Sequence, residues 1–90
     1  MATSERDLEK IFKALGNRRR LSILRILKKD GKLSVGDIAS EIDMSIKATS
    51  KHVAILAGAG LLDREKHGLG VWYGISNDLV ETSRKVLLLL

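Results

Sequence analysis

The sequence contains no cysteine at any of its 90 positions. The chain can therefore form no disulfide and no thiolate metal site, and it offers no cysteine nucleophile. It also lacks an apolar run of the roughly 18 residues that a membrane-spanning helix requires, and its polar, acidic start is unlike a secretory signal. The apolar end, Val86 to Leu90, is too short to serve as an anchor. We therefore expect a cytoplasmic protein that uses no membrane.

The size and charge of the chain limit how many domains it can form and which partners it can bind. Residues 1–90 are enough for a single domain, and a chain of this size buries only about 60 to 65% of the surface that its unfolded form exposes. Such a domain is marginally stable as a monomer. The net charge of +5 and the sequence pI near 9.8 favour an acidic partner, such as nucleic acid or an anionic surface, although many soluble domains are equally basic.

Acidic residues are absent between Ser45 and Gly60, where the sequence predicts a helix with two different faces. Its inward face carries Thr49, Val53 and Leu56 at helical spacing. The outward face is polar, short-chained and basic, with Lys47, Ser50, Lys51 and Ala54. Ser45 is a good N-cap residue, and a glycine after residue 57 can close the helix in the left-handed conformation. A basic helix of this kind suits the major groove of DNA.

Three further helices are predicted before this one. Apolar residues on one face indicate a helix over about 5–15 and another over about 18–28, the second with a face wide enough to be buried on two sides. A Ser34 cap predicts a third helix from Val35 to Ile42. Two short helices joined by a tight connection, the second of them basic, form a helix-turn-helix over about 34–57.

The segment after residue 60 predicts a hairpin and a last helix. Residues 61–66 and 70–75 are the segments with strand character, and the glycines between them supply a flexible tip. Such a hairpin over about 61–75 is called a wing. A fifth helix is expected to start at Ser76 to Asp78. The fold is therefore predicted to be mainly α with a β-hairpin, a winged helix-turn-helix of order α-α-α-α-β-β-α.

Three consecutive arginines, Arg18, Arg19 and Arg20, occupy the first turn of the second helix. The helix dipole disfavours cations there by a few tenths of a kcal/mol each, roughly. One interpretation is a solvated basic turn. The other is that an arginine contacts a DNA phosphate or a carboxylate of a partner subunit.

The chain resembles the ArsR (SmtB-like) family of winged-helix transcriptional repressors from Ile11 to Ser76. The segments that carry the resemblance, in order, are Phe12 to Asn17 with Arg20 to Leu24, Leu33 to Ala39, Ser50 to Leu56, Ala59 to Leu62, and Val71 to Tyr73. The resemblance implies a homodimer in which the first and fifth helices pair across a two-fold axis. It also implies that two recognition helices enter successive major grooves of a partly palindromic operator in double-stranded DNA.

Two departures from the family pattern matter. Arg18 stands where the family commonly has proline, which removes some preorganisation of the second helix. The family's metal sensors carry cysteines in the third helix or spaced His and Asp in the fifth, and neither set is present here. His52 and His67 lie on different elements with no third ligand near either. We therefore expect no metal sensing and no cofactor.

The candidate DNA-binding residues come from the recognition helix and the wing. Lysine can reach phosphates or guanine, serine a base edge or a phosphate, and histidine can donate to either. An apolar residue near the helix start could touch a thymine methyl or instead pack on the third helix, and the wing cations could contact DNA or only solvent. The residues are Ile46, Lys47, Ser50, Lys51, His52, Arg64, Lys66 and His67.

The candidate dimer residues are apolar positions that exceed the needs of one small core. The first and last helices of each subunit would bury this excess apolar surface against the same helices of a second subunit, although the leucines at 88–90 could equally be a frayed tail. The residues are Leu8, Ile11, Phe12, Leu15, Leu79, Val86 and Leu87.

The leading functional prediction is a dimeric, sequence-specific DNA-binding repressor. An alternative is a protein-interaction module that uses the hairpin or the leucine-rich last helix. We do not expect an enzyme, because no histidine has a suitably spaced carboxylate and serine and no glycine-rich phosphate loop follows a strand.

Overall fold

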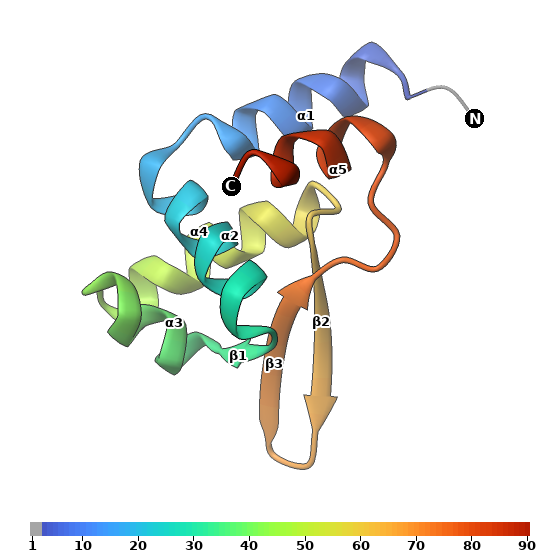
Figure 1. Cartoon of the computed structure of the whole chain (residues 1–90). Coiled ribbons are helices and arrows are strands. Elements are labelled where there is room, and N and C mark those ends of the chain that lie inside the picture. The colour runs from blue at the N-terminus through green and yellow to red at the C-terminus, as the bar shows by residue number, and fades with distance from the viewer. Residues whose placement is uncertain (1–2) are drawn as a thin grey trace.

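The computed structural model describes residues 3–90, in which five helices support a small antiparallel sheet (Figure 1). The helices α1 to α4 precede the hairpin and α5 follows it, as the sequence predicts. The element bounds are α1 Glu5–Leu15, α2 Arg18–Asp30, β1 Leu33–Ser34, α3 Val35–Ile42, α4 Ile46–Gly58, β2 Leu62–His67, β3 Gly70–Ile75 and α5 Glu81–Leu88.

Side-chain caps start the first four helices. In each case a side-chain oxygen accepts a hydrogen bond from a backbone N–H two or three residues further on, which satisfies a donor that the helix itself cannot. The capping residues are Ser4, Asn17, Ser34 and Ser45. The predicted starts of α1 to α4 are therefore confirmed.

The turn between α3 and α4 is tight because Asp43 adopts the left-handed conformation, with φ 54°. Aspartate tolerates this conformation better than most residues. The Met44 N–H then donates to the Ala39 carbonyl at 3.0 Å and the Asp43 N–H to the Ser40 carbonyl at 3.4 Å, so two carbonyls of the last turn of α3 have partners. At the other end of α4, Gly60 has φ 76° and closes the helix as predicted.

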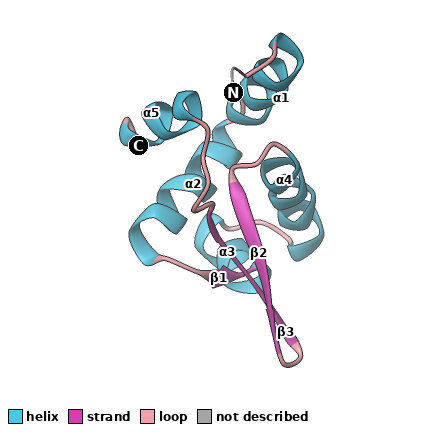
Figure 2. Ribbon diagram, turned by 90° about the vertical axis from the view of Figure 1, so that its right-hand side faces the viewer, coloured by secondary structure: helices cyan, strands magenta, loops and turns pink. Residues whose placement is uncertain are grey.

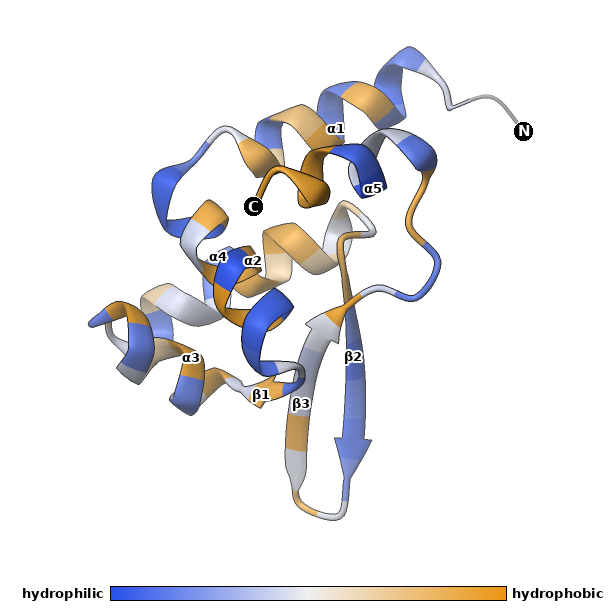
Figure 3. Ribbon diagram, viewed as in Figure 1, coloured by the Kyte–Doolittle hydropathy of each residue, from blue (hydrophilic) through white to orange (hydrophobic). Residues whose placement is uncertain are grey.

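The core forms around α2, which packs against α1, α3, α4 and β3. Ile23, Leu24 and Leu27 of α2 are buried, and the predicted inward face of α4 is buried with them. Figure 3 shows the apolar residues of these helices together with the apolar end of α5. The prediction that the apolar face of α2 is buried on two sides is confirmed.

The sheet has three strands in the order β1-β3-β2, one more than the sequence predicts. Leu33 pairs with Tyr73 and Ser34 with Trp72. A two-residue strand is too short to show a period, so the pattern could not reveal it. The hairpin of β2 and β3 extends beyond the helices (Figure 2).

The expected start of the fifth helix at residues 76–78 is wrong, because α5 begins at Glu81. The Ser76 hydroxyl accepts a hydrogen bond from the Asp78 N–H, and the Asn77 N–H donates to the Asp63 carboxylate, both at 3.1 Å. Such local side-chain bonds offer the backbone an alternative to a helix. This segment is therefore tied to β2 instead. Among residues 3–90, no helix is both long and apolar enough to cross a bilayer.

Candidate nucleic-acid interface

The outer face of α4 is exposed and basic. Lys47, Ser50 and Lys51 are exposed, and no acidic residue occurs in the helix. Ile46, the first residue of α4, is 61% exposed, so its side chain is not packed into α3 and is free to touch a ligand. The sequence-predicted residues of this helix are therefore brought together on an accessible surface, with His52 half-buried beside them.

Arg20 does not lie in a solvated turn, which corrects one interpretation of the arginine cluster. Its Nε donates to the Ala14 carbonyl at 2.7 Å and its Nη2 to the Lys13 carbonyl at 3.0 Å. These carbonyls lie at the end of α1, where the helix dipole favours a cation. Arg19 similarly donates to the Ile42 carbonyl at the end of α3, at 3.3 Å. The unfavourable dipole of α2 is thus offset by two neighbouring helix ends.

The remaining guanidinium nitrogen of Arg20, Nη1, lies 3.3 Å from Nδ1 of His52. Burial of the ring, followed by the charges of Arg20 and Arg19, lowers the pKa of His52 below its ordinary value. The imidazole is therefore neutral at pH 7. Because arginine can only donate, Nδ1 must be the acceptor and the ring proton lies on Nε2. Sequence reasoning missed this pair, although the misplaced arginines were a signal of it.

The two faces of the wing carry different charges. Side chains two residues apart in a strand share a face, so Arg64 and Lys66 lie on the same face of β2 as Leu62, whose side chain is in the core. Asp63, Glu65 and His67 alternate onto the other face. The two acids therefore lie on the face opposite Arg64 and Lys66. The sequence-predicted group of Arg64, Lys66 and His67 is divided, with His67 on the opposite face from the other two.

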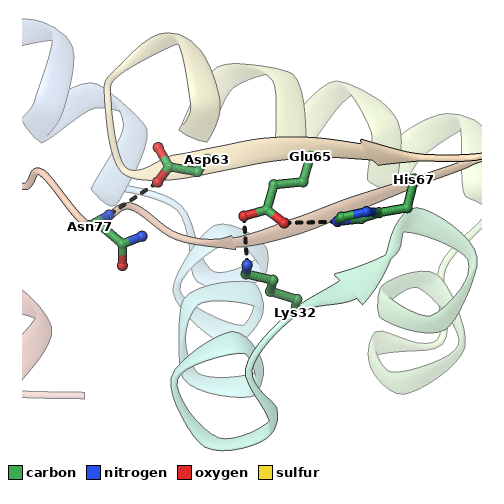
Figure 4. Close-up of polar contacts among 5 residues, drawn as sticks. All are labelled: Lys32, Asp63, Glu65, His67 and Asn77. Atoms are coloured by element: carbon green, nitrogen blue, oxygen red, sulfur yellow. Dashed lines mark hydrogen bonds and ion pairs between the residues drawn. The ribbon is translucent and has the colours of Figure 1, made fainter.

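Glu65 holds the opposite face of the wing together (Figure 4). Its carboxylate accepts from Lys32 Nζ at 2.5 Å and lies 3.0 Å from Nε2 of His67. The hydrogen bond from Lys32, and then the one from His67, lower the pKa of Glu65. Lys32 precedes β1, so its side chain must cross β3 to reach β2.

Gly74 makes that crossing possible. A Cβ at position 74 would lie 2.9 Å from Cγ of Lys32, closer than carbon atoms can approach. We expect Gly74→Ala to displace Lys32, to lower the free energy of unfolding by about 1 to 3 kcal/mol, and to raise the pKa of Glu65. Urea unfolding and an NMR titration of the Glu65 carboxylate measure the two effects.

Gly70→Ala is the matched control in the same strand, because its nearest neighbour, Nε1 of Trp72, would be 3.4 Å from the new Cβ. If Gly74→Ala left the Glu65 pKa as low as in the unsubstituted chain, Lys32 would not depend on this glycine.

The predicted dimer residues differ in how much of their surface is exposed. Ile11, Leu15 and Leu87 are buried within the single chain, so they offer almost no surface to a second copy. Phe12 is 54% exposed, since it points about 100° away from Ile11 around α1. Three of the residues are half-buried, namely Leu8, Leu79 and Val86. Exposed apolar residues that join Phe12 as candidates are Val80, which was not predicted, and Leu88 and Leu89, for which a frayed tail was the alternative.

Within residues 3–90, no three His, Asp or Glu side chains lie close enough together to hold one ion.

Known proteins are similar to this chain over the segment that contains the helix-turn-helix. A family of helix-turn-helix domains matches residues 15–65, which run from the end of α1 into β2. The transcriptional activator HlyU from Vibrio cholerae is 38% identical over 77 residues, covering 86% of this chain and 70% of that protein. The arsenical resistance operon repressor of Escherichia coli is 34% identical, covering 86% of this chain and 66% of that protein.

Solved structures agree with the sequence matches. The structure of HlyU superposes with a TM-score of 0.80 at 32% identity, covering 99% of this chain and 92% of that one. A homodimeric winged helix-turn-helix DNA-binding domain from Mycobacterium bovis, described as a possible ArsR-family regulator, superposes with a TM-score of 0.79 at 27% identity. It covers 99% of this chain and 84% of that one.

The family match covers more than half of the chain, and the relatives regulate transcription, a class of proteins that are not enzymes. The resemblance expected from the sequence is confirmed. The chain belongs to the ArsR family of winged helix-turn-helix transcriptional regulators.

Proposed function

We propose that the chain is a homodimeric repressor that places α4 of each subunit in successive major grooves of a partly palindromic operator. The observation that carries this proposal is the outer face of α4, which presents Lys47, Ser50 and Lys51 without an opposing acid. A helix with this face can pair its cations with phosphates or guanine and its hydroxyl with either a base or a phosphate. Its inner face is fixed in the core, so α4 meets DNA as a rigid element.

The wing supplies a second contact. Arg64 and Lys66 are exposed on one face of the hairpin, and the acidic residues of β2 lie on the opposite face. We assign these two residues to the DNA backbone or the minor groove. His67 is bonded to Glu65 on the opposite face, which makes it the weakest of the predicted DNA-binding residues.

The dimer contact is assigned to α1 and α5. These helices lie at the end of the molecule opposite the wing tip (Figure 1), so a second copy docked there would leave α4 free. Phe12, Leu88 and Leu89 are more than half exposed at this end. The same exposed leucines favour the alternative function, a protein-interaction module. The mass of the chain in solution separates the two, because an adaptor without a second copy would be a monomer.

Selection from a random pool of duplex oligonucleotides tests the proposal. We expect recovery of two similar half-sites related by a two-fold axis, with centres about 10 base pairs apart. Binding to the selected duplex should weaken steeply as the salt concentration rises, because phosphate contacts release counterions. Recovery of no common sequence, or of a single half-site by a monomer, would contradict it.

A further inference from the structure

Arg20 is the residue whose position the proposed function does not explain. It lies in the first turn of α2, where its charge is opposed by the dipole of its own helix. It is nevertheless half-buried, and all three guanidinium nitrogens have partners. Two of those partners are carbonyls at the end of α1, and the third is Nδ1 of His52 in α4. One side chain therefore joins three helices.

The contact with α4 has a chemical consequence for His52. The guanidinium has five N–H donors and no acceptor, so it can bond only to an unprotonated Nδ1. A proton on Nδ1 would remove the acceptor and set one N–H donor against another, and a second proton on the ring would also place like charge against Arg20. The hydrogen bond therefore selects the neutral ring with its proton on Nε2, which leaves the ring one N–H donor for an external acceptor. The charged groups acting on the ring are Arg20 and Arg19, both from α2.

We infer that Arg20 is a positioning residue for DNA recognition, which fixes α4 against the end of α1 and holds His52 as an Nε2–H donor. This inference rests on the proposed function, because the acceptor for Nε2–H is taken to be a phosphate oxygen or a base acceptor of the operator. The planar, forked geometry of the Arg20 guanidinium is essential to this role. A lysine at position 20 would bring one point charge and could not keep the spacing of all three contacts.

A purely structural role for Arg20 predicts a different response of His52 when Arg20 is substituted. If Arg20 only satisfied the Lys13 and Ala14 carbonyls, its loss would weaken the end of α1 and would leave the state of His52 unchanged. The state of the ring is therefore the measurement that separates the two roles.

The first experiment measures the ring nitrogens of His52 by ¹⁵N NMR in the full chain without DNA. We expect the Nε2–H tautomer in the unsubstituted chain. Arg20→Gln should give a mixture of tautomers and should raise the titration midpoint of His52 toward its ordinary value of about 6.5. Arg20→Lys should also lose the single tautomer, although it retains the charge. Arg18→Gln is the matched control, because Arg18 is exposed in the same turn and carries the same charge.

The second experiment measures affinity for the selected duplex in a double-mutant cycle with His52→Ala. Arg20→Gln should weaken binding by about tenfold when His52 is present and by less than about threefold in the His52→Ala background. Circular dichroism at the assay temperature verifies that each variant is folded, and Arg20→Lys replaces Arg20→Gln if the latter is not.

An equal loss of affinity in both backgrounds, or an Nδ1–H tautomer in the unsubstituted chain, would overturn the inference. If no duplex is bound at all, the proposed function fails. The NMR experiment would still show whether Arg20 sets the state of His52.

Discussion

Reversing the charge of Lys47 and Lys51 together is expected to lower affinity for the selected operator by more than about 100-fold. Each lysine that contacts DNA contributes on the order of 1 to 3 kcal/mol, and a glutamate adds repulsion from the phosphates. Both side chains are exposed on α4, so the substitutions Lys47→Glu and Lys51→Glu should leave the core intact. Fluorescence anisotropy with the labelled duplex at fixed salt measures the loss.

The salt dependence of binding gives a second measurement on the same variant. If the two lysines neutralise phosphates, the slope of log affinity against log salt should become shallower by about 2. If instead they contact base edges alone, affinity should fall with little change in slope.

A control for net charge is available on α1 and α5. Lys10 and Lys85 are exposed on α1 and α5, and reversing both changes the net charge by the same amount. We expect this variant, once shown to have the same mass in solution, to lose less than about fivefold in affinity, because separated exposed charges are screened. An equal loss in both variants would indicate unspecific attraction to DNA.

The second large effect is expected from Phe12→Asp, which should convert the proposed homodimer into a monomer. Phe12 is 54% exposed on α1, and burying an aromatic ring of this size against a second copy contributes roughly 1.5 to 3 kcal/mol per subunit. The substitution both removes this gain and buries a charge in the interface. Sedimentation or light scattering measures the mass in solution.

Affinity for the operator should fall with the loss of the dimer, by about 100-fold or more. A dimer that holds one half-site presents its second subunit at a high effective concentration, and a monomer loses this advantage. Binding to an isolated half-site should be unchanged. Leu69→Asp at the tip of the wing is the control for mass, since it places the same charge on an exposed leucine far from α1. A dimeric Phe12→Asp chain would show that α1 is not at the interface.

Most of the helical part of the fold could be predicted from local patterns. Ser4, Asn17, Ser34 and Ser45 cap their helices within three residues, so the information for each start is contained in a few neighbouring positions. The two-faced character of α4 follows equally from its spacing, and Thr49, Val53 and Leu56 are buried as predicted. The strand β1 and the start of α5 were not predictable, since pairing and competing turn bonds decide them.

Within the candidate site, the exposed residues of α4 could be predicted, while the contacts that hold α4 in place could not. The sequence marked Arg18 to Arg20 as misplaced but could not say which partners offset the cost. The pattern of the wing placed Arg64, Lys66 and His67 in one group because it counted charges, whereas strand alternation divides them between two faces. Apolar character likewise did not distinguish Ile11, which is buried in its own subunit, from Phe12, which is exposed.

The sequence by itself determined the helix-turn-helix, the wing, the basic outer face of α4 and the family. These depend on periodicity and capping, which act over a few residues along the chain. Only the tertiary structure decided that Arg20 meets His52, 32 residues away, and that Lys32 crosses Gly74 to meet Glu65, 33 residues away. The reason is physical, because a hydrogen bond between side chains depends on the distance in space that packing imposes, and no local pattern encodes that distance.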